Sequence, residues 1–148
     1  MIRDSVRSFA KDKILPYARD WDRAGAFPRD LLKEMGKLGF LGVPVPEEYG
    51  GAGLDYIAEA IVFEEVGYAD SSVRTTLSVQ MSLVELTILR YAPEELKKAY
   101  LPKLCSGEWI GCFGLTEPAA GSDPGGMKTR PTRTEGGYVL NGSKMWIS

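Results

Sequence analysis

The sequence of 148 residues contains no histidine and only two cysteines, Cys105 and Cys112. Without imidazole the chain cannot build a Ser-His triad or a histidine-ligated metal site. The two cysteines form no CxxC pair, and we expect both to be reduced thiols, as in a cytoplasmic protein. Any catalysis must therefore depend on carboxylates, on a bound cofactor or on both.

The sequence also lacks a strong net charge and a long apolar segment. Its net charge is −2, and its hydrophobic and charged fractions of 44% and 26% are typical of soluble globular proteins. No basic stretch predicts nucleic-acid binding, no apolar run could span a membrane, and the charged start lacks an apolar signal core. There is no GxGxxG motif or P-loop. We expect a cytoplasmic protein without a metal site.

Apolar side chains in the first part of the chain recur at the spacing of a helix. This spacing predicts helices over these segments: 2–21 with a break near Pro16, 28–39, 57–67, 72–88 and 93–107. We expect the third helix to end at Gly67 and Asp70 to cap the fourth. The fourth would carry five apolar residues inward: Val73, Leu77, Met81, Val84 and Ile88.

From Trp109 the apolar spacing changes to two, which predicts strands over 109–116 and 127–134, and two more strands within 138–148. Asn141-Gly142 is a strong hairpin signal between the last two. The fold class is therefore α+β, with an all-α domain over 1–107 followed over 108–148 by the first strands of an incomplete β-barrel-like domain. Because the chain stops in mid-strand, we expect it to be a piece of a longer protein.

The segment LTEPAAGSDPGGMKTR (115–130) places turn-forming residues between two predicted strands. Its small residues 119–121 would let a flat ligand or a phosphate approach the backbone, and the amides near Ser122 could form an anion-binding nest. A solvated loop with an Asx turn at Asp123 explains the same residues. The local chemistry leaves both interpretations open.

The combination of FGLTEPAAGSD (113–123) with LNGSKMWIS (140–148) resembles the acyl-CoA dehydrogenase family of flavoproteins. GFLGVPVPEEYGGAGLD (39–55) and ELKKAYLPKLCSGEWIGCFGLTEP (95–118) extend the resemblance over the amino-terminal part of that family. The resemblance implies FAD as cofactor, an acyl-CoA thioester as substrate, an electron-transfer flavoprotein as acceptor and a homo-oligomer, commonly a homotetramer. The family's catalytic base lies beyond residue 148, so no residue here is assigned a catalytic role. An acyl-CoA oxidase and a non-catalytic binding module of the same fold are the alternatives.

The resemblance also implies which residues contact FAD: Phe113, Gly114, Leu115, Thr116, Gly121, Ser122, Trp146, Ile147 and Ser148. Thr116 would bond the pyrimidine side of the flavin, and Ser122 would lie where the pyrophosphate meets the CoA thioester. Trp146 would pack on the flavin, and Ser148 would face its N5 and O4 atoms. From the residues alone, Trp146 is better explained as the core aromatic of a hairpin.

SSVRTTLSVQMSLV (71–84) resembles the glutaryl-CoA dehydrogenases within this family. The resemblance implies that Arg74 and its neighbour Thr75, together with Ser122, bind substrate, since a guanidinium binds a distal carboxylate bidentately. Gly67 departs from the pattern, because an acidic residue is expected there. Surface pairing of Arg74 with Asp70 is the alternative. Four acids receive no chemical role and are expected on helix surfaces or first turns: Glu64, Glu65, Glu94 and Glu95.

Overall fold

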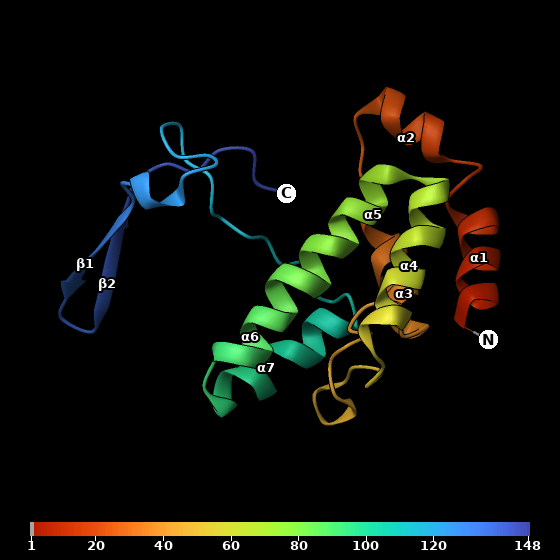
Figure 1. Ribbon diagram of the computed structural model, residues 1–148, viewed down its shortest axis with the longest axis horizontal. Coiled ribbons are helices and arrows are strands. Elements are labelled where there is room, and N and C mark those ends of the chain that lie inside the picture. The colour runs from red at the N-terminus through yellow and green to blue at the C-terminus, as the bar shows by residue number, and fades with distance from the viewer. Residues whose placement is uncertain (1) are drawn as a thin grey trace. The chain divides into compact units, whose positions relative to one another are not determined.

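The computed structural model describes residues 2–148 and divides into two compact units, Met1–Gly111 and Cys112–Ser148. The first unit is helical and the second contains a β-hairpin, as Figure 1 shows. The predicted α+β class is confirmed. The elements of the helical unit are α1 (Ile2–Lys13), α2 (Ala18–Ala24), α3 (Arg29–Lys37), the 3₁₀ turn η1 (Glu47–Tyr49), α4 (Tyr56–Ala69), α5 (Ser71–Ser78), the π-helix η2 (Val79–Glu85), α6 (Leu86–Tyr91) and α7 (Glu94–Cys105).

The helical unit is built around a continuous apolar core. Helix α4 packs against both α1 and α5, and α7 packs against η1 and η2. Fully buried side chains from five elements meet there: Val6, Met35, Val62, Val66, Leu77 and Met81. Each such side chain stabilises the fold by about 1.5–3 kcal/mol through removal of apolar surface from water. No helix within residues 2–148 is both long and apolar enough to cross a bilayer.

The junction between α4 and α5 corrects one predicted boundary. Helix α4 continues through Gly67 to Ala69 and ends at Asp70, whose backbone is extended. The Asp70 carboxylate accepts a hydrogen bond from the amide of Val73 at 2.7 Å, which confirms the predicted cap of α5. Gly67 instead makes room for Arg74, because a Cβ at Gly67 would lie 3.2 Å from the Arg74 Cγ.

The π-helix η2 corrects the predicted inward face of the fourth helix. Bonds between residues five apart, in place of four, insert an extra residue into the turn and shift the phase of every later side chain. Val73, Leu77 and Met81 are buried as predicted, but the next buried position is Glu85. The predicted Val84 is only half-buried.

The second unit holds the short turn η3 (Pro124–Gly126) and two strands, β1 (Arg130–Thr134) and β2 (Gly137–Asn141). The strands pair antiparallel from Arg130 opposite Asn141 to Thr134 opposite Gly137. Their turn is therefore Glu135-Gly136, with Gly136 at φ 81°, and the prediction of a hairpin at Asn141-Gly142 was wrong. Gly142 instead lies so close to Thr129 that any side chain there would collide with it.

The predicted strand over 109–116 is absent from the described chain. A strand needs a neighbour to accept and donate its backbone hydrogen bonds. Gly111 donates instead to the side chain of Gln80 at 2.8 Å. In the second unit, Met145 donates its amide to the Thr116 carbonyl at 2.9 Å, which is one bond rather than a ladder.

Candidate functional site

Seven of the nine residues expected at FAD lie in the second unit on two segments, 113–116 and 146–148, which we call the flavin segments. The Thr116–Met145 backbone bond brings these segments side by side. The Lys144 ammonium reinforces the contact by donating to the Leu115 carbonyl at 3.0 Å. Segments far apart in the sequence thus meet in the structure.

The flavin segments expose an apolar and aromatic surface. Phe113, Leu115 and Ile147 remain 37–39% exposed, and Trp146 is 84% exposed. Trp146 is therefore not a core residue of a hairpin, which removes the alternative explanation of this side chain. It also adopts φ 57°, a left-handed conformation that is unfavourable for a residue other than glycine. Exposed aromatic surface next to a strained backbone suits a flat ligand such as a flavin ring.

The loop between Glu117 and Met127 presents Gly121 and Ser122 to solvent. Asp123 accepts a hydrogen bond from the Gly125 amide at 2.9 Å, which is the Asx turn expected if this segment is a solvated loop. A Cβ at Gly121 would meet no atom within 4 Å, so open space lies beside this backbone. Gly114 also has room, since the nearest atom to an added Cβ is the Lys144 Cγ at 3.7 Å. The loop therefore leaves its backbone accessible to a ligand.

Glu117 is a buried acid of the second unit for which the sequence predicts no role. Its carboxylate is buried and accepts hydrogen bonds from the amides of Lys128 at 2.6 Å and Thr129 at 3.1 Å, and from the Lys144 ammonium at 2.9 Å. Bonds from Thr129, from the Lys128 backbone and from Lys144 lower the pKa of Glu117 to about 2. From the sequence, Glu117 is only an acid at the start of a turn, and no local pattern indicates which residues donate hydrogen bonds to it.

The expected substrate residues Arg74 and Thr75 lie half-buried on α5, in the helical unit. The Thr75 hydroxyl donates to the Ser71 carbonyl at 2.8 Å, one helical turn earlier. Within residues 2–148 we find no ion pair of Arg74, and the Asp70 carboxylate is engaged at the α5 cap. The surface pair of Arg74 with Asp70 is therefore not formed.

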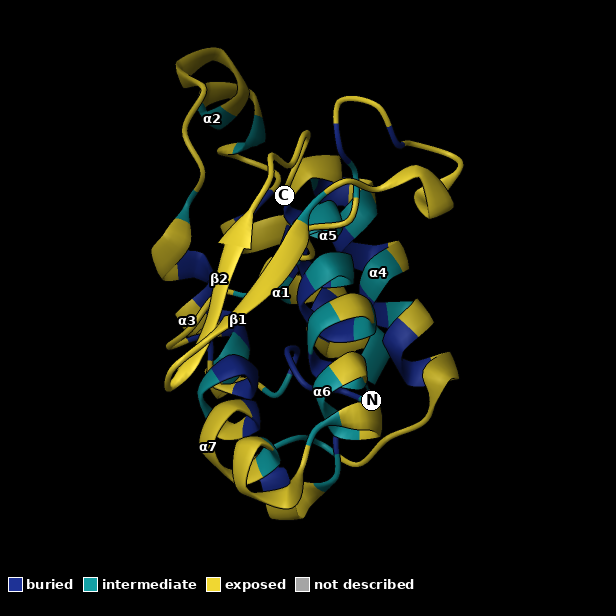
Figure 2. Ribbon diagram, turned by 90° about the vertical axis from the view of Figure 1, so that its left-hand side faces the viewer, coloured by how far each residue is buried: buried dark blue, intermediate teal, exposed yellow. Residues whose placement is uncertain are grey.

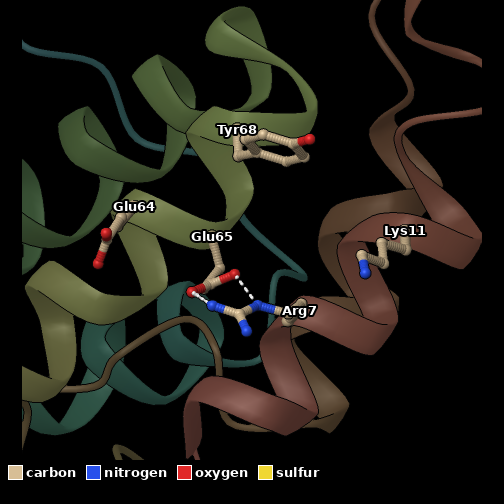
Figure 3. Close-up of a pocket in the computed structure, with 5 residues that line it drawn as sticks. All are labelled: Arg7, Lys11, Glu64, Glu65 and Tyr68. Carbon is tan, nitrogen blue, oxygen red and sulfur yellow. Dashed lines mark hydrogen bonds and ion pairs between the residues drawn. The ribbon is translucent and has the colours of Figure 1, made fainter.

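A cavity of about 310 Å³ lies between α1 and α4, lined by Arg7, Lys11, Glu64, Glu65 and Tyr68 (Figure 3). Glu65 points toward Arg7 and receives two bonds from its guanidinium, both at 2.8 Å. The bonds from Arg7, joined by those from Arg3, lower the pKa of Glu65 to about 2 against the opposing effect of burial. The expectation that Glu65 is a solvated surface acid was wrong, because it ties α1 to α4.

A second acid without an assigned role, Glu94, is also engaged in structural contacts. Glu94 lies in the first turn of α7, as predicted, and accepts a hydrogen bond from the Tyr49 hydroxyl at 3.0 Å. That bond lowers the pKa of Glu94, and Lys98 contributes further. Among residues 2–148, no group of three or more Cys, Asp or Glu side chains could hold a metal ion. Both cysteines are free thiols, Cys105 buried and Cys112 exposed.

Comparison with known proteins places this geometry in context. Residues 1–108 match the family model of the acyl-CoA dehydrogenase N-terminal domain, and residues 112–148 match that of the middle domain. Glutaryl-CoA dehydrogenase of Desulfococcus multivorans is 44% identical over 100% of this chain and 39% of its own length. Mitochondrial isovaleryl-CoA dehydrogenase of Solanum tuberosum is 46% identical over 99% of this chain and 36% of its own.

The solved structure of a glutaryl-CoA dehydrogenase from Mycobacterium smegmatis in complex with FADH2 superimposes with a TM-score of 0.94 and 42% identity. The superposition covers 99% of this chain and 38% of the solved chain. The chain thus spans well under half the length of the curated relatives it matches. Because both family models match and the fold agrees, the chain belongs to the acyl-CoA dehydrogenase family, which is FAD-dependent.

Proposed function

We propose that this chain is part of an enzyme that oxidises an acyl-CoA thioester to the 2,3-enoyl-CoA. The observation that carries the proposal is the exposed aromatic and apolar surface of the flavin segments, held together at Thr116 and Met145. When bound there, FAD would accept the hydride from the β-carbon, a step for which no side chain has suitable chemistry. The protein would position the cofactor and exclude water.

The residues present fit a flavin. The indole of Trp146 would pack on the ring, with Phe113 and Leu115 adding apolar contact. The Thr116 and Ser148 hydroxyls would supply hydrogen bonds to the polar edges of the ring, and Ser122 would bond the pyrophosphate beside the open backbone at Gly121. We place the base that removes the α-proton outside residues 1–148.

For the substrate, we propose a dicarboxylic acyl-CoA such as glutaryl-CoA. Arg74 supports this proposal because no carboxylate among residues 2–148 neutralises its charge. A half-buried guanidinium without such a partner suits the distal carboxylate of an acyl chain. Thr75 would assist from the neighbouring position.

The substrate proposal is tested with Arg74→Ala in the full-length enzyme. We expect kcat/KM for glutaryl-CoA to fall about tenfold or more, with little change for butyryl-CoA, because only the former carries the second carboxylate. Arg19→Ala, on an exposed position of α2, is the matched control. Equal losses on both thioesters would reject carboxylate recognition by Arg74.

The reaction is tested by the visible spectrum of the full-length protein. We expect flavin absorbance that bleaches when an acyl-CoA is added under anaerobic conditions. A colourless protein indifferent to FAD would refute the proposal, and flavin that never bleaches would indicate a binding module. Release of peroxide on turnover would indicate an acyl-CoA oxidase. An electron-transfer flavoprotein as acceptor, a homo-oligomer and a cytoplasmic location stay predictions.

A further inference from the structure

The second unit is held together by polar contacts rather than by an apolar core. Among residues 112–148 only Glu117 and Ala120 are buried. Every residue of β1 and β2 is exposed, as Figure 2 shows. A buried carboxylate is costly unless it is bonded, so the contacts that Glu117 makes decide whether this arrangement persists.

Three residues from two separate segments converge on the Glu117 carboxylate. Lys128 and Thr129, just before β1, present their backbone amides to it at 2.6 and 3.1 Å. Lys144, after β2, presents its ammonium at 2.9 Å. The bonds to the carboxylate are charge-assisted, which makes them about twice as strong as neutral hydrogen bonds.

Lys144 connects this cluster to both flavin segments. Its ammonium also donates to the Leu115 carbonyl at 3.0 Å, in the first flavin segment. The next residue, Met145, donates its amide to Thr116 at 2.9 Å and leads directly into Trp146. Removing Glu117 would leave the ammonium without its anion and the amides of Lys128 and Thr129 without their acceptor.

We infer that Glu117, through Lys144, is a positioning residue that holds the two flavin segments side by side in the arrangement that binds FAD. The inference rests on the proposed function. It is independent of the base and of the substrate, since all the contacts lie within residues 115–145. The low pKa of Glu117, about 2, keeps the carboxylate charged at neutral pH.

The test measures FAD binding to the full-length apoprotein by titration, together with the circular dichroism of the bound flavin. Glu117→Gln keeps the shape of the side chain and removes its charge, Lys144→Met removes the ammonium, and the exposed Glu135→Gln in the hairpin turn is the control. We expect the FAD dissociation constant to rise about tenfold or more for the first two variants. The double variant should bind FAD no more weakly than either single variant, because both substitutions remove the same contact, the one between Glu117 and Lys144.

The flavin circular dichroism separates positioning from general destabilisation. A changed signal at saturating FAD in Glu117→Gln, with an unchanged signal in Glu135→Gln, supports the inference. Wild-type affinity and an unchanged signal in Glu117→Gln would overturn it while leaving the proposed function intact. A wild-type protein that does not bind FAD would refute the proposed function, and the positioning role with it. If Glu117→Gln does not fold, Glu117→Asp, which keeps the charge on a shorter side chain, is judged by the same criteria.

Discussion

Glu85 carries a carboxyl group that is fully buried inside the helical unit. Neither of its oxygens completes a hydrogen bond among the described residues. Burial raises its pKa to about 8, the negative charge of Glu59 adds to the rise, and polar contacts from Gln80 and the Gly42 backbone oppose it. Glu85 is therefore mostly protonated at neutral pH, and this single residue makes the stability of the unit depend on pH.

Glu85→Gln should stabilise the helical unit, and more so at higher pH. The pKa of Glu85 is about 8 when folded and about 4.5 when unfolded, so below about pH 4.5 the group is protonated in both states. Between these values only the unfolded chain loses its proton, and the free energy of unfolding falls by roughly 1.4 kcal/mol per pH unit. Above about pH 8 the contribution is constant. The side-chain amide of glutamine does not ionise, so Glu85→Gln removes this fall in the free energy of unfolding.

Urea unfolding at pH 5 and pH 8, followed by far-ultraviolet circular dichroism, checks this prediction. The stability advantage of Glu85→Gln over wild type should be larger at pH 8. Glu108→Gln, at an exposed position, should follow the wild-type dependence. The same advantage at both pH values would show that Glu85 does not titrate between them.

At the scale of elements, α1 is held to α4 by a polar tie as well as by apolar packing. The tie joins Arg3 and Arg7 of α1 to Glu65 of α4. It spans 58 positions between Arg7 and Glu65, so it depends on the tertiary fold. Among the residues that the structure describes, neighbouring Glu64 pairs only with Arg3, at 2.8 Å, and it is far more exposed than Glu65.

Glu65→Gln should loosen α1 and remove part of the acid sensitivity of the helical unit. The pKa of Glu65 is lowered to about 2, so its stabilising contribution is present above about pH 4.5 and lost as the pH falls toward 2. Amide hydrogen exchange in α1 should be faster in Glu65→Gln at pH 6. Glu64→Gln is the matched control. Comparable effects of the two substitutions would contradict a special role for Glu65.

The hairpin of β1 and β2 should be the least stable element of this chain. Both of its faces are exposed, and an isolated two-stranded hairpin is marginal in water. We expect the strand amides to exchange much faster than those of α4 when the 148-residue chain is studied alone. Protection of the hairpin equal to that of α4 would show that the polar contacts of the second unit suffice by themselves.

At the scale of the whole molecule, the two units differ in what stabilises them. The helical unit is stabilised by an apolar core. The second unit is stabilised by the polar contacts of Glu117, and its flavin segments are exposed. Four acids are buried among residues 2–148: Glu59, Glu65, Glu85 and Glu117. Glu65 and Glu117 accept bonds from cationic side chains, Glu59 accepts one from the Ser82 hydroxyl at 2.9 Å, and Glu85 is enclosed. We therefore expect the base of the proposed reaction to come from outside these residues.

The 148-residue chain alone should give no acyl-CoA oxidation, even with FAD and a dye as electron acceptor. We expect its helical unit to fold, as judged by far-ultraviolet circular dichroism, while turnover stays at background. The full-length enzyme, assayed in parallel, provides the positive control. Turnover by the short chain would show that a carboxylate within it acts as the base.

Local chemistry was sufficient to predict the helices, the Asp70 cap and the α+β class. These features depend on residues within a few positions of one another, and their signals are therefore present in the sequence. The family resemblance, carried by two short motifs, also predicted the family and its cofactor.

Only the tertiary structure decided which side chains meet across the chain. The π-helix moved Glu85 into the position predicted for Val84, because one extra residue in a turn shifts the phase of all that follow. Glu65 and Glu117 looked like ordinary acids until the fold brought Arg7 and Lys144 to them. The turn formed at Glu135-Gly136 because strand pairing, not the local Asn-Gly signal, set the register. Periodicity is a local property, whereas the partner of a buried charge is chosen by the packing of distant segments.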